Sequence, residues 1–253
     1  ARIRKREDDM KLRVMGVAGT LAILVAFSAR ADLAGLWLFD GSSGDVAVDS
    51  SGNGNDGVIN NGNRVGGKIG GAVELNGTDA NVEIPHSASL SVNEFTLMAW
   101  VDSPAFTGGW QTIATQHTDG PTRNYGLFIN DSSGLVHYSF TSGNGWNSFN
   151  ATSDVVGGGW RHVAATYDGA MFTCYVDGAV DGETPVALVP DTAESVVTLG
   201  SWVGGGWLAG KLDEVALYDS ALSASEIAAA MQGVTPVESK GKLAVTWGAL
   251  RTR

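Results

Sequence analysis

The sequence predicts an all-β domain, a two-sheet antiparallel β-sandwich with one short C-terminal helix. Three observations support this fold class. Short runs rich in β-branched and aromatic residues recur along the chain, glycine is abundant at 35 residues, and Asn-Gly, Asp-Gly or Gly-Gly pairs separate the runs. Many short strands joined by regular turns are typical of antiparallel sandwiches.

The expected strands are short and are closed by turn residues. ATYDGAMFTCYVDG shows the pattern most clearly, because a turn at Asp168-Gly169 separates two runs with the composition of hairpin strands. The runs that we expect to form strands span residues 36–40, 72–75, 81–84, 95–101, 111–115, 125–130, 135–140, 160–167, 172–176, 195–200 and 212–218.

The run FTLMAWV is apolar on both faces of the expected strand. Residues 95, 97, 99 and 101 share one face, and Met98 and Trp100 share the other. A two-layer sandwich needs only one apolar face per strand. The second face therefore either lines a groove or is covered by loops.

One helix is expected near the C-terminus. Ser223 and Glu226 form a capping box, and residues 227–232 continue the helical pattern. Gly233 then ends the helix, and Pro236 prevents its continuation.

The first part of the chain has the features of an export signal. Met10 opens a short basic region, an apolar run follows over residues 14–27, and residues 29–31 have a small-x-small cleavage pattern. The alternative is a membrane anchor, but a spanning helix usually needs about 20 apolar residues. We expect a secreted, cell-surface or periplasmic protein with no membrane span after cleavage. Its parts are an upstream extension and signal peptide (1–31), one domain (32–233), and a linker with a short tail (234–253).

The expected mature chain is strongly acidic. Seven of the 16 basic residues and three of the 27 acidic residues lie within the first 31, which leaves 9 basic and 24 acidic groups, a net charge of −15. Such a surface repels phosphate backbones, so we expect no nucleic-acid partner. Acidity suits calcium binding, although it is also explained by solubility alone.

Cys174 is the only cysteine, so no intrachain disulfide can form. It shares one face of the expected strand 172–176 with Phe172 and Val176, which predicts a buried small apolar side chain. An exported chain without disulfides relies on a large core or on metal.

Seven segments resemble, in order, those of the LamG-like jelly-roll domains of the concanavalin A-like lectin/glucanase superfamily, in their bacterial form. No single segment is specific for this family, but the occurrence of all seven in the same order is specific for it. The resemblance implies a jelly roll of two antiparallel sheets over residues 32–233. The segments are GLWLFDGSSGDVAVDSSGNGNDG (35–57), GGKIGGAVELNGTDANVEIP (66–85), SLSVNEFTLMAWV (89–101), YGLFI (125–129), GWRHVAATYDG (159–169), YVDG (175–178) and GKLDEVALYDSALSASEI (210–227).

The resemblance also implies that the first and last strands lie near each other, where many relatives bind a structural calcium ion. The implied ligands in this chain are Asp40, Asn53, Asn55 and Asp213. Calcium prefers carboxylate, amide and carbonyl oxygens, and a glycine-rich loop exposes its carbonyls. The alternative is that the loop DSSGNGNDG (49–57) is held by Asx turns without a metal.

Asp213 and Glu214 are the notable carboxylates of the last expected strand. Strict alternation over residues 212–218 places Asp213 on the face of Val215 and Leu217, and places Glu214 on the opposite face. An aspartate among such neighbours is costly unless it is paired or bound to metal.

The sequence lacks a catalytic pattern. Glycosidases of this superfamily use two carboxylates about 5–9 Å apart, whereas adjacent residues of a strand point to opposite faces. The four histidines are scattered, and neither HExxH nor G-x-S-x-G occurs. We therefore expect no enzymatic activity.

Aromatic, amide and basic side chains gather in the expected loops. Sugars present apolar C–H faces and hydroxyl edges, so their binding sites combine aromatic surfaces with hydrogen-bonding side chains. The alternative for each tryptophan is that it fills space beneath a loop. The candidate ligand-binding residues are Trp110, Arg123, Asn124, Asn144, Trp146, Trp202 and Trp207.

The sequence thus predicts a secreted binding module that recognises a glycan and carries a structural calcium ion. One alternative is an extracellular adhesion module with a protein ligand, and another is a glycoside hydrolase or lyase of the same fold.

Overall fold

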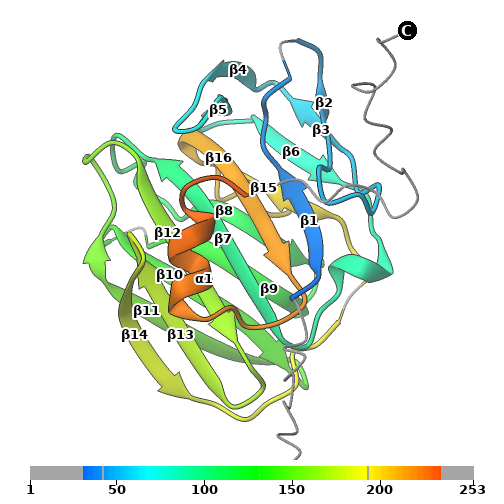
Figure 1. Cartoon of the computed structure of the whole chain (residues 1–253), viewed down its shortest axis with the longest axis vertical. Helices are drawn as coiled ribbons and strands as arrows, with labels where there is room; N and C mark the ends of the chain where they lie inside the picture. Colours follow the sequence, from blue (N-terminus) through cyan, green and yellow to red (C-terminus); the bar gives the residue numbers. More distant parts are fainter. Residues whose placement is uncertain (1–30, 42, 131, 193, 235–253) are drawn as a thin grey trace, which may run out of the picture. The chain divides into compact units, whose positions relative to one another are not determined.

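The computed structural model describes residues 31–41, 43–130, 132–192 and 194–234 (Figure 1). The predicted signal segment, except Ala31, and the predicted tail, except Val234, lie outside the described residues. No helix in the described ranges is long and apolar enough to cross a membrane.

Two antiparallel sheets form the domain, which confirms the predicted β-sandwich. Sheet A has the strand order β14-β13-β12-β7-β16-β5-β4. Its eighth strand, β1, pairs with β16 and is not part of this linear order. Sheet B has the order β11-β10-β9-β8-β15-β6-β3-β2. Sheet A contains β1 (Leu33–Trp37), β4 (Asn63–Gly66), β5 (Gly71–Asn76), β7 (Phe95–Asp102), β12 (Arg161–Tyr167), β13 (Met171–Val176), β14 (Ala179–Pro185) and β16 (Ala209–Tyr218). Sheet B contains β2 (Val46–Ala47), β3 (Gly57–Asn60), β6 (Asn81–Ile84), β8 (Gln111–His117), β9 (Arg123–Ile129), β10 (Leu135–Ser142), β11 (Gly145–Asp154) and β15 (Val197–Leu199).

The main core lies between the two sheets. Alternate side chains of β7, among them Leu97 and Val101, meet inward side chains of sheet B such as Leu127 and Tyr138 in one buried cluster. Cys174 belongs to the same cluster and is buried, as predicted. Because successive side chains of a strand point to opposite faces, each core strand also presents a second face outward.

The outer face of sheet A is covered by the C-terminal helix. Met98 packs there with Ile227 of the helix and with Leu36 of β1 in a second buried cluster. The second face of β7 is therefore covered at Met98 by a helix, and not by the loops that we expected. Figure 1 shows the helix α1 (Ala224–Ala230) in front of this sheet. The predicted capping box is present, since the Ser223 side chain accepts from the Glu226 amide and the Glu226 side chain accepts from the Ser223 amide.

Several elements were not predicted. β2, β3 and β4 lie in segments that we expected to be loops, as does the 3₁₀ helix η1 (Ala88–Leu90). β11 and β14 were missed because they are polar, glycine-containing strands at the edges of the two sheets. An edge strand of this kind has no continuous apolar face for a sequence pattern to detect.

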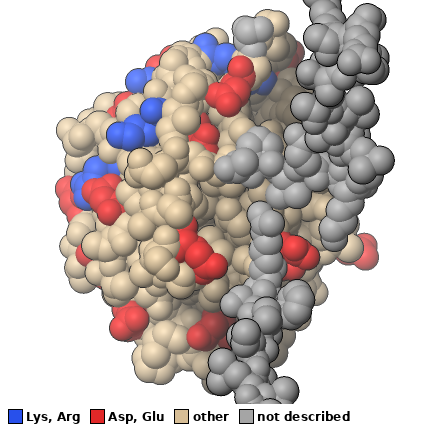
Figure 2. Space-filling model, in the orientation of Figure 1, with Lys and Arg blue, Asp and Glu red and all other residues tan. Residues whose placement is uncertain are grey.

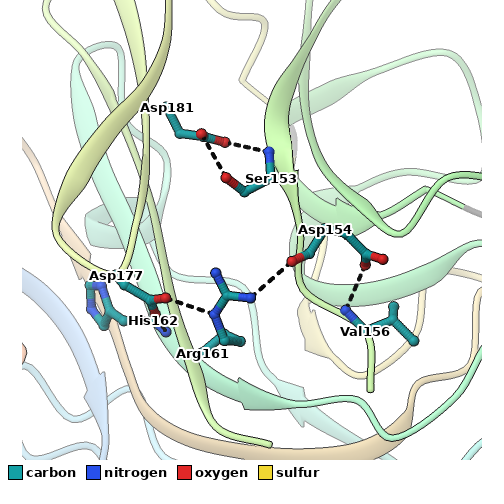
Figure 3. Close-up of polar contacts among 7 residues, drawn as sticks. All are labelled: Ser153, Asp154, Val156, Arg161, His162, Asp177 and Asp181. Carbon is teal, nitrogen blue, oxygen red and sulfur yellow. Dashed lines mark hydrogen bonds and ion pairs between the residues drawn. The ribbon is translucent and has the colours of Figure 1, made fainter. Parts of the chain in front are cut away.

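A carboxylate joins these two edge strands (Figure 3). Asp181 on β14 accepts from the Thr152 amide at 2.7 Å and its hydroxyl at 2.8 Å, and from the Ser153 amide and hydroxyl at 2.9 Å each. Nearby, Arg161 donates to Asp177 at 2.7 Å and to the Asp154 carbonyl at 2.9 Å. One side of the sandwich is therefore closed by polar contacts between the sheets.

Asp181→Ala should lower the free energy of unfolding by about 1–3 kcal/mol, because it leaves the donors of β11 without their partner. Burial acts to raise the pKa of Asp181, but the hydrogen bonds from Ser153 and Thr152 outweigh it and lower the pKa. The stabilisation should therefore be present above about pH 4 and be lost as the pH falls below that value.

Urea denaturation at several pH values measures this effect. Glu183→Ala, which removes an exposed carboxylate from the same strand, is the matched control. Equal stability losses in the two variants would contradict the assignment of Asp181 as the link between the sheets.

Candidate functional site

A cluster of aromatic and basic side chains lies on the outer face of sheet B. Its rings form a connected set: Trp110 contacts His137 with ring centroids 4.7 Å apart, and Phe128 contacts Trp202 at 5.8 Å. Further contacts extend the set toward the β10–β11 turn. We call this cluster the aromatic platform, defined as Trp110, His117, Arg123, Phe128, His137, Trp146 and Trp202.

Strand pairing explains why the platform forms. Leu127 of β9 faces Tyr138 of β10, and both point into the core. The next pair along the strands, Phe128 and His137, therefore points outward. Trp110 precedes β8, and Trp202 follows β15, so two loops add indole rings at one end of the sheet.

Gly126 makes room for the side chains that lie over it. A Cβ atom at this position would come within 2.4 Å of the Phe128 ring and 2.9 Å of Cδ of Arg123. Only glycine therefore allows Phe128 and Arg123 to lie flat against the strand here.

Arg123 is held between two rings. Its guanidinium carbon lies 4.4 Å from the Phe128 centroid and 4.7 Å from the Trp146 centroid, and Nη1 donates to the Ser139 hydroxyl. Cation–π contacts of this kind strengthen as the site loses water. Burial lowers the pKa of Arg123 to about 10, so the guanidinium is still charged at neutral pH.

The two histidines of the platform, His117 and His137, have lowered pKa values, so they do not share the positive charge of Arg123 at neutral pH. Burial, followed by the charge of Arg123, lowers the pKa of His117. Burial also lowers the pKa of His137, against a 2.8 Å hydrogen bond with Asn150 that raises it. Both imidazoles are therefore neutral at pH 7, and the platform combines flat apolar surface with a single cation.

The structure brings together four of the seven candidate ligand-binding residues. Trp110, Arg123, Trp146 and Trp202 belong to the platform, although Arg123 and Trp146 lie on strands and not in the loops that we expected. Sequence reasoning missed Phe128 and His137. The signal was present, because Phe128 alternates with the inward Leu127 and Ile129.

The other three candidates lie elsewhere. The Asn124 side chain is fully buried and links Val92 to Asp191 through hydrogen bonds of 2.9 Å each, so it has a structural role. Asn144 has a positive φ of 61° in the β10–β11 turn, where its amide donates to Asp191. Trp207 is partly exposed in the segment before β16.

The four candidate metal ligands separate into two places. Asn53 and Asn55 donate side-chain hydrogen bonds to the Ala34 carbonyl at the start of β1, at 3.1 and 2.9 Å. Asp40, beyond the other end of β1, accepts from the Gly71 amide at 2.8 Å. Asp213 accepts from the Ile69 amide at 2.9 Å, in the same loop. The structure thus brings Asp40 and Asp213 to one loop and does not bring Asn53 and Asn55 to it.

The loop 49–57 is organised by Asp49. One of its oxygens accepts from the Leu36 and Ser51 amides at 3.0 and 2.9 Å, and the other accepts from the Ser51 hydroxyl and the Asn55 amide at 2.8 and 2.9 Å. The Trp37 indole donates to the Asn55 carbonyl at 3.0 Å. These contacts match the Asx-turn alternative, in which side chains and backbone hold the loop.

The face predicted for Asp213 was wrong because β16 contains a bulge, whereas Glu214 does lie on the face opposite Val215 and Leu217. The register shifts between Asp213 and Ala216, and Glu214 has a φ of 50°. The extra residue reverses the alternation, so Asp213 pairs with Trp100 on the outer side of sheet A while Val215 points into the core. Glu214 is also on the outer side, where it accepts from the Val234 amide at 2.8 Å.

Asp213 is a buried carboxylate with one unsatisfied oxygen. It is 0% exposed, and its Oδ1 makes no hydrogen bond within the described ranges. Burial raises the pKa of Asp213 to about 7, and the neighbouring Glu214 adds to this effect. Among the described residues, no three His, Cys, Asp or Glu side chains are grouped to hold a metal ion, so a cation here would also need backbone oxygens.

Comparison with known proteins identifies the family. The model of the concanavalin A-like lectin/glucanases superfamily matches residues 76–228, more than half of the chain. The chain belongs to this superfamily. No curated protein matches its sequence.

Solved structures show the same fold at low sequence identity. Domain 4 of AbnA, a GH43 extracellular arabinanase from Geobacillus stearothermophilus solved in complex with arabinotriose, is 23% identical, with a TM-score of 0.63 over 79% of this chain and 98% of that domain. The binding domain of Paraclostridial Mosquitocidal Protein 1 is 16% identical, with a TM-score of 0.65 over 78% of this chain and 51% of that one. Trypanosoma rangeli sialidase, in complex with the inhibitor DANA, is 18% identical, with a TM-score of 0.61 over 78% of this chain and 32% of the sialidase. This chain thus spans only about half of the toxin's binding domain and a third of the sialidase.

In metal-free protein, the raised pKa of Asp213 predicts that stability falls as the pH rises. The folded state keeps the proton up to about pH 7, whereas the unfolded chain releases it near about pH 4. Deprotonation between these values therefore favours unfolding. The Asp213→Asn side chain cannot ionise, so this variant should lose most of the dependence of stability on pH. A smaller dependence should remain in it, because burial also raises the pKa of Glu214.

Urea denaturation in EDTA from about pH 5 to about pH 8 measures the slope. Asp219→Asn, which removes an exposed carboxylate directly after the end of β16 at Tyr218, serves as the control. An Asp213→Asn slope equal to that of the wild type would show that Asp213 ionises normally.

Proposed function

We propose that this protein is an exported, non-catalytic module that binds carbohydrate on the aromatic platform. The observation that supports this most directly is the platform itself, a row of aromatic rings on the outer face of sheet B with Trp146 51% exposed at its edge. Flat rings suit the apolar faces of sugars, and the neighbouring Arg123, Ser139 and Asn150 supply hydrogen-bonding groups.

Two further observations favour a sugar ligand. The superfamily to which the chain belongs is one of lectins and glucanases, and the arabinanase domain of similar fold was solved with arabinotriose. The basic and apolar segment at residues 10–31 favours export. A binding role without catalysis is also consistent with the platform, since the residues that define it include no carboxylate, whereas glycosidases generally use two.

A protein ligand is the second candidate function. The binding domain of a mosquitocidal toxin has a similar fold, and exposed aromatic and arginine side chains are also frequent in protein interfaces. The experiment below separates the two functions.

Trp146→Ala should weaken glycan binding at least about tenfold, because it removes the most exposed ring of the platform. A glycan array that includes arabinotriose identifies ligands, and titration calorimetry then compares the variants. Val180→Ala is the control, since Val180 is also 51% exposed but lies on β14 of the other sheet.

Wild-type affinity in Trp146→Ala would exclude the platform as the sugar site. A protein partner whose binding depends on Trp146, together with the lack of any glycan signal, would favour the second candidate. Turnover of a polysaccharide would instead favour a glycoside hydrolase or lyase.

We also propose a structural calcium ion beside Asp213. The unsatisfied buried Oδ1 fits a cation, and Asp40 brings a second carboxylate to the same loop. Gly67 and Gly70 permit close approach, since a Cβ atom at either position would lie within 2.6 Å of Asp213 or 2.0 Å of Asp40. When bound, the ion would neutralise the carboxylates and link the 67–71 loop to β16.

EDTA should lower the melting temperature of wild-type protein purified with calcium, because the buried Asp213 carboxylate would lose its counter-ion. Asp213→Asn should melt at the same temperature with and without EDTA. An unchanged wild-type melting temperature, on protein shown by elemental analysis to have lost its metal, would reject the calcium site.

A further inference from the structure

Arg123 is the one buried cationic side chain among the described residues, and it lacks a strong acceptor. Lys68, which is exposed to water, lies 4.6 Å from the centre of the Trp100 ring. Arg161 pairs with Asp177 and Lys211 pairs with Asp102, at 2.7 and 3.3 Å. Arg64 donates to three backbone carbonyls. Arg123 has only the Ser139 hydroxyl and two ring faces.

This arrangement is energetically incomplete. Arg123 is only 9% exposed, and its Nε is fully enclosed without a hydrogen-bond partner in the described part of the chain. A buried charge is costly unless it is paired and hydrogen-bonded. The planar guanidinium is also the side chain best suited to bind a carboxylate, sulfate or phosphate through two parallel hydrogen bonds. The missing partner is therefore expected to be an oxyanion supplied from outside.

The position of Arg123 favours an anion that belongs to a sugar. Its guanidinium lies between Phe128 and Trp146, so a group that binds it would hold the rest of the ligand against the platform. Trp146 is the more exposed of the two covering rings and lies next to the β10–β11 turn. It is therefore the ring that an entering ligand can displace most readily.

We propose that the platform selects acidic sugars, and that Arg123 binds the carboxylate or sulfate group of the glycan while the aromatic rings contact its apolar face. This inference rests on the proposed carbohydrate-binding function and adds the chemical class of the ligand.

The acidity of the chain as a whole does not oppose this selection. On the face drawn in Figure 2, which is the α1 side of sheet A and not the face that carries the platform, acidic side chains are scattered over the surface. At physiological ionic strength their fields are screened beyond about 8 Å. Close to the platform, the acidic group that acts on its histidines is Asp119, which raises the pKa of His117 less than burial and Arg123 lower it.

A single-stranded nucleic acid is the less favoured anion. Its bases also stack on aromatic rings, but its binding sites follow the phosphate backbone with several cations. The platform supplies one charged cation, and the expected mature chain has a net charge of −15 with 24 acidic groups against 9 basic ones.

Matched pairs of sugars test the proposal on the full chain. Lactose, 3′-sialyllactose and lactose 3′-sulfate share one disaccharide and differ in the anion. Trigalacturonate and its methyl ester differ in charge and in the added methyl groups. Calorimetry should show that at least one anionic sugar binds about tenfold or more tightly than its neutral counterpart, and the preferred pair distinguishes sialate, sulfate and uronate.

Arg123→Gln should abolish the preference for the anion, so that the charged and the neutral sugar of a pair bind with affinities within about twofold of each other. Arg123→Lys, which keeps the charge but loses the planar fork, should retain part of the preference. Lys211→Gln is the control, because it removes one positive charge from sheet A. If Arg123→Gln does not fold, wild-type binding at increasing salt replaces it: only the anionic sugar should lose affinity.

The outcomes separate the two proposals. Equal wild-type affinity for charged and neutral sugars, with binding still dependent on Trp146, would overturn the selection of acidic sugars and leave the carbohydrate function standing. A preference for the anion that survives in Arg123→Gln would also overturn it. If no sugar binds, or if Trp146-dependent binding is found only for an oligonucleotide, both proposals fail.

Discussion

The pairing of β9 with β10 couples the core of this protein to its candidate binding face. Leu127 opposite Tyr138 fills the space between the sheets, and Phe128 opposite His137 stands on the outside. A shift of one residue in this register would place the outward ring in the core and the inward leucine on the surface. The free energy of core packing therefore also fixes where the platform lies, and the site needs no separate scaffold.

β16 has a comparable role in sheet A. It pairs along one edge with β7, and along the other edge first with β5 and then with β1. The bulge at Glu214 lies where the strand changes from one partner to the next. It allows Leu212 and Val215 both to reach the core, and it turns two neighbouring carboxylates toward the outer layer. Burial in that layer raises the pKa values of both Asp213 and Glu214, so the raised pKa values follow from the geometry of the strand.

The fold was predictable from the sequence because its strongest signals are local. The capping box at Ser223, the alternation in FTLMAWV and the turn at Asp168-Gly169 each reflect nearby residues only. β11 was not predictable in this way, since its sequence GWNSFNATSD is mostly polar and has no continuous apolar face. The bulge at Glu214 could not be predicted either, because it depends on the pairing of β16 with strands that are distant in the sequence.

The candidate site was predicted in part. The neighbouring glycines predicted that Trp110, Trp146 and Trp202 contribute to a binding site, and all three lie in the aromatic platform. Residue type alone did not distinguish Arg123, which contacts the rings, from Asn124, which links buried backbone segments. Nor did it reveal that Asn53 and Asn55 bind the start of β1 while Asp40 lies beyond its end. These differences arise from contacts between residues far apart in the chain.

The contact between Asp181 and β11 also affects whether copies of the protein can associate through the edges of their sheets. β11 and β14 are terminal strands of their sheets, and unpaired amides of such strands can recruit a strand from another copy. Asp181 occupies the amides of Thr152 and Ser153 and places a negative charge beside them. The same carboxylate that joins the sheets thus also opposes fibril-like growth by strand addition at this edge.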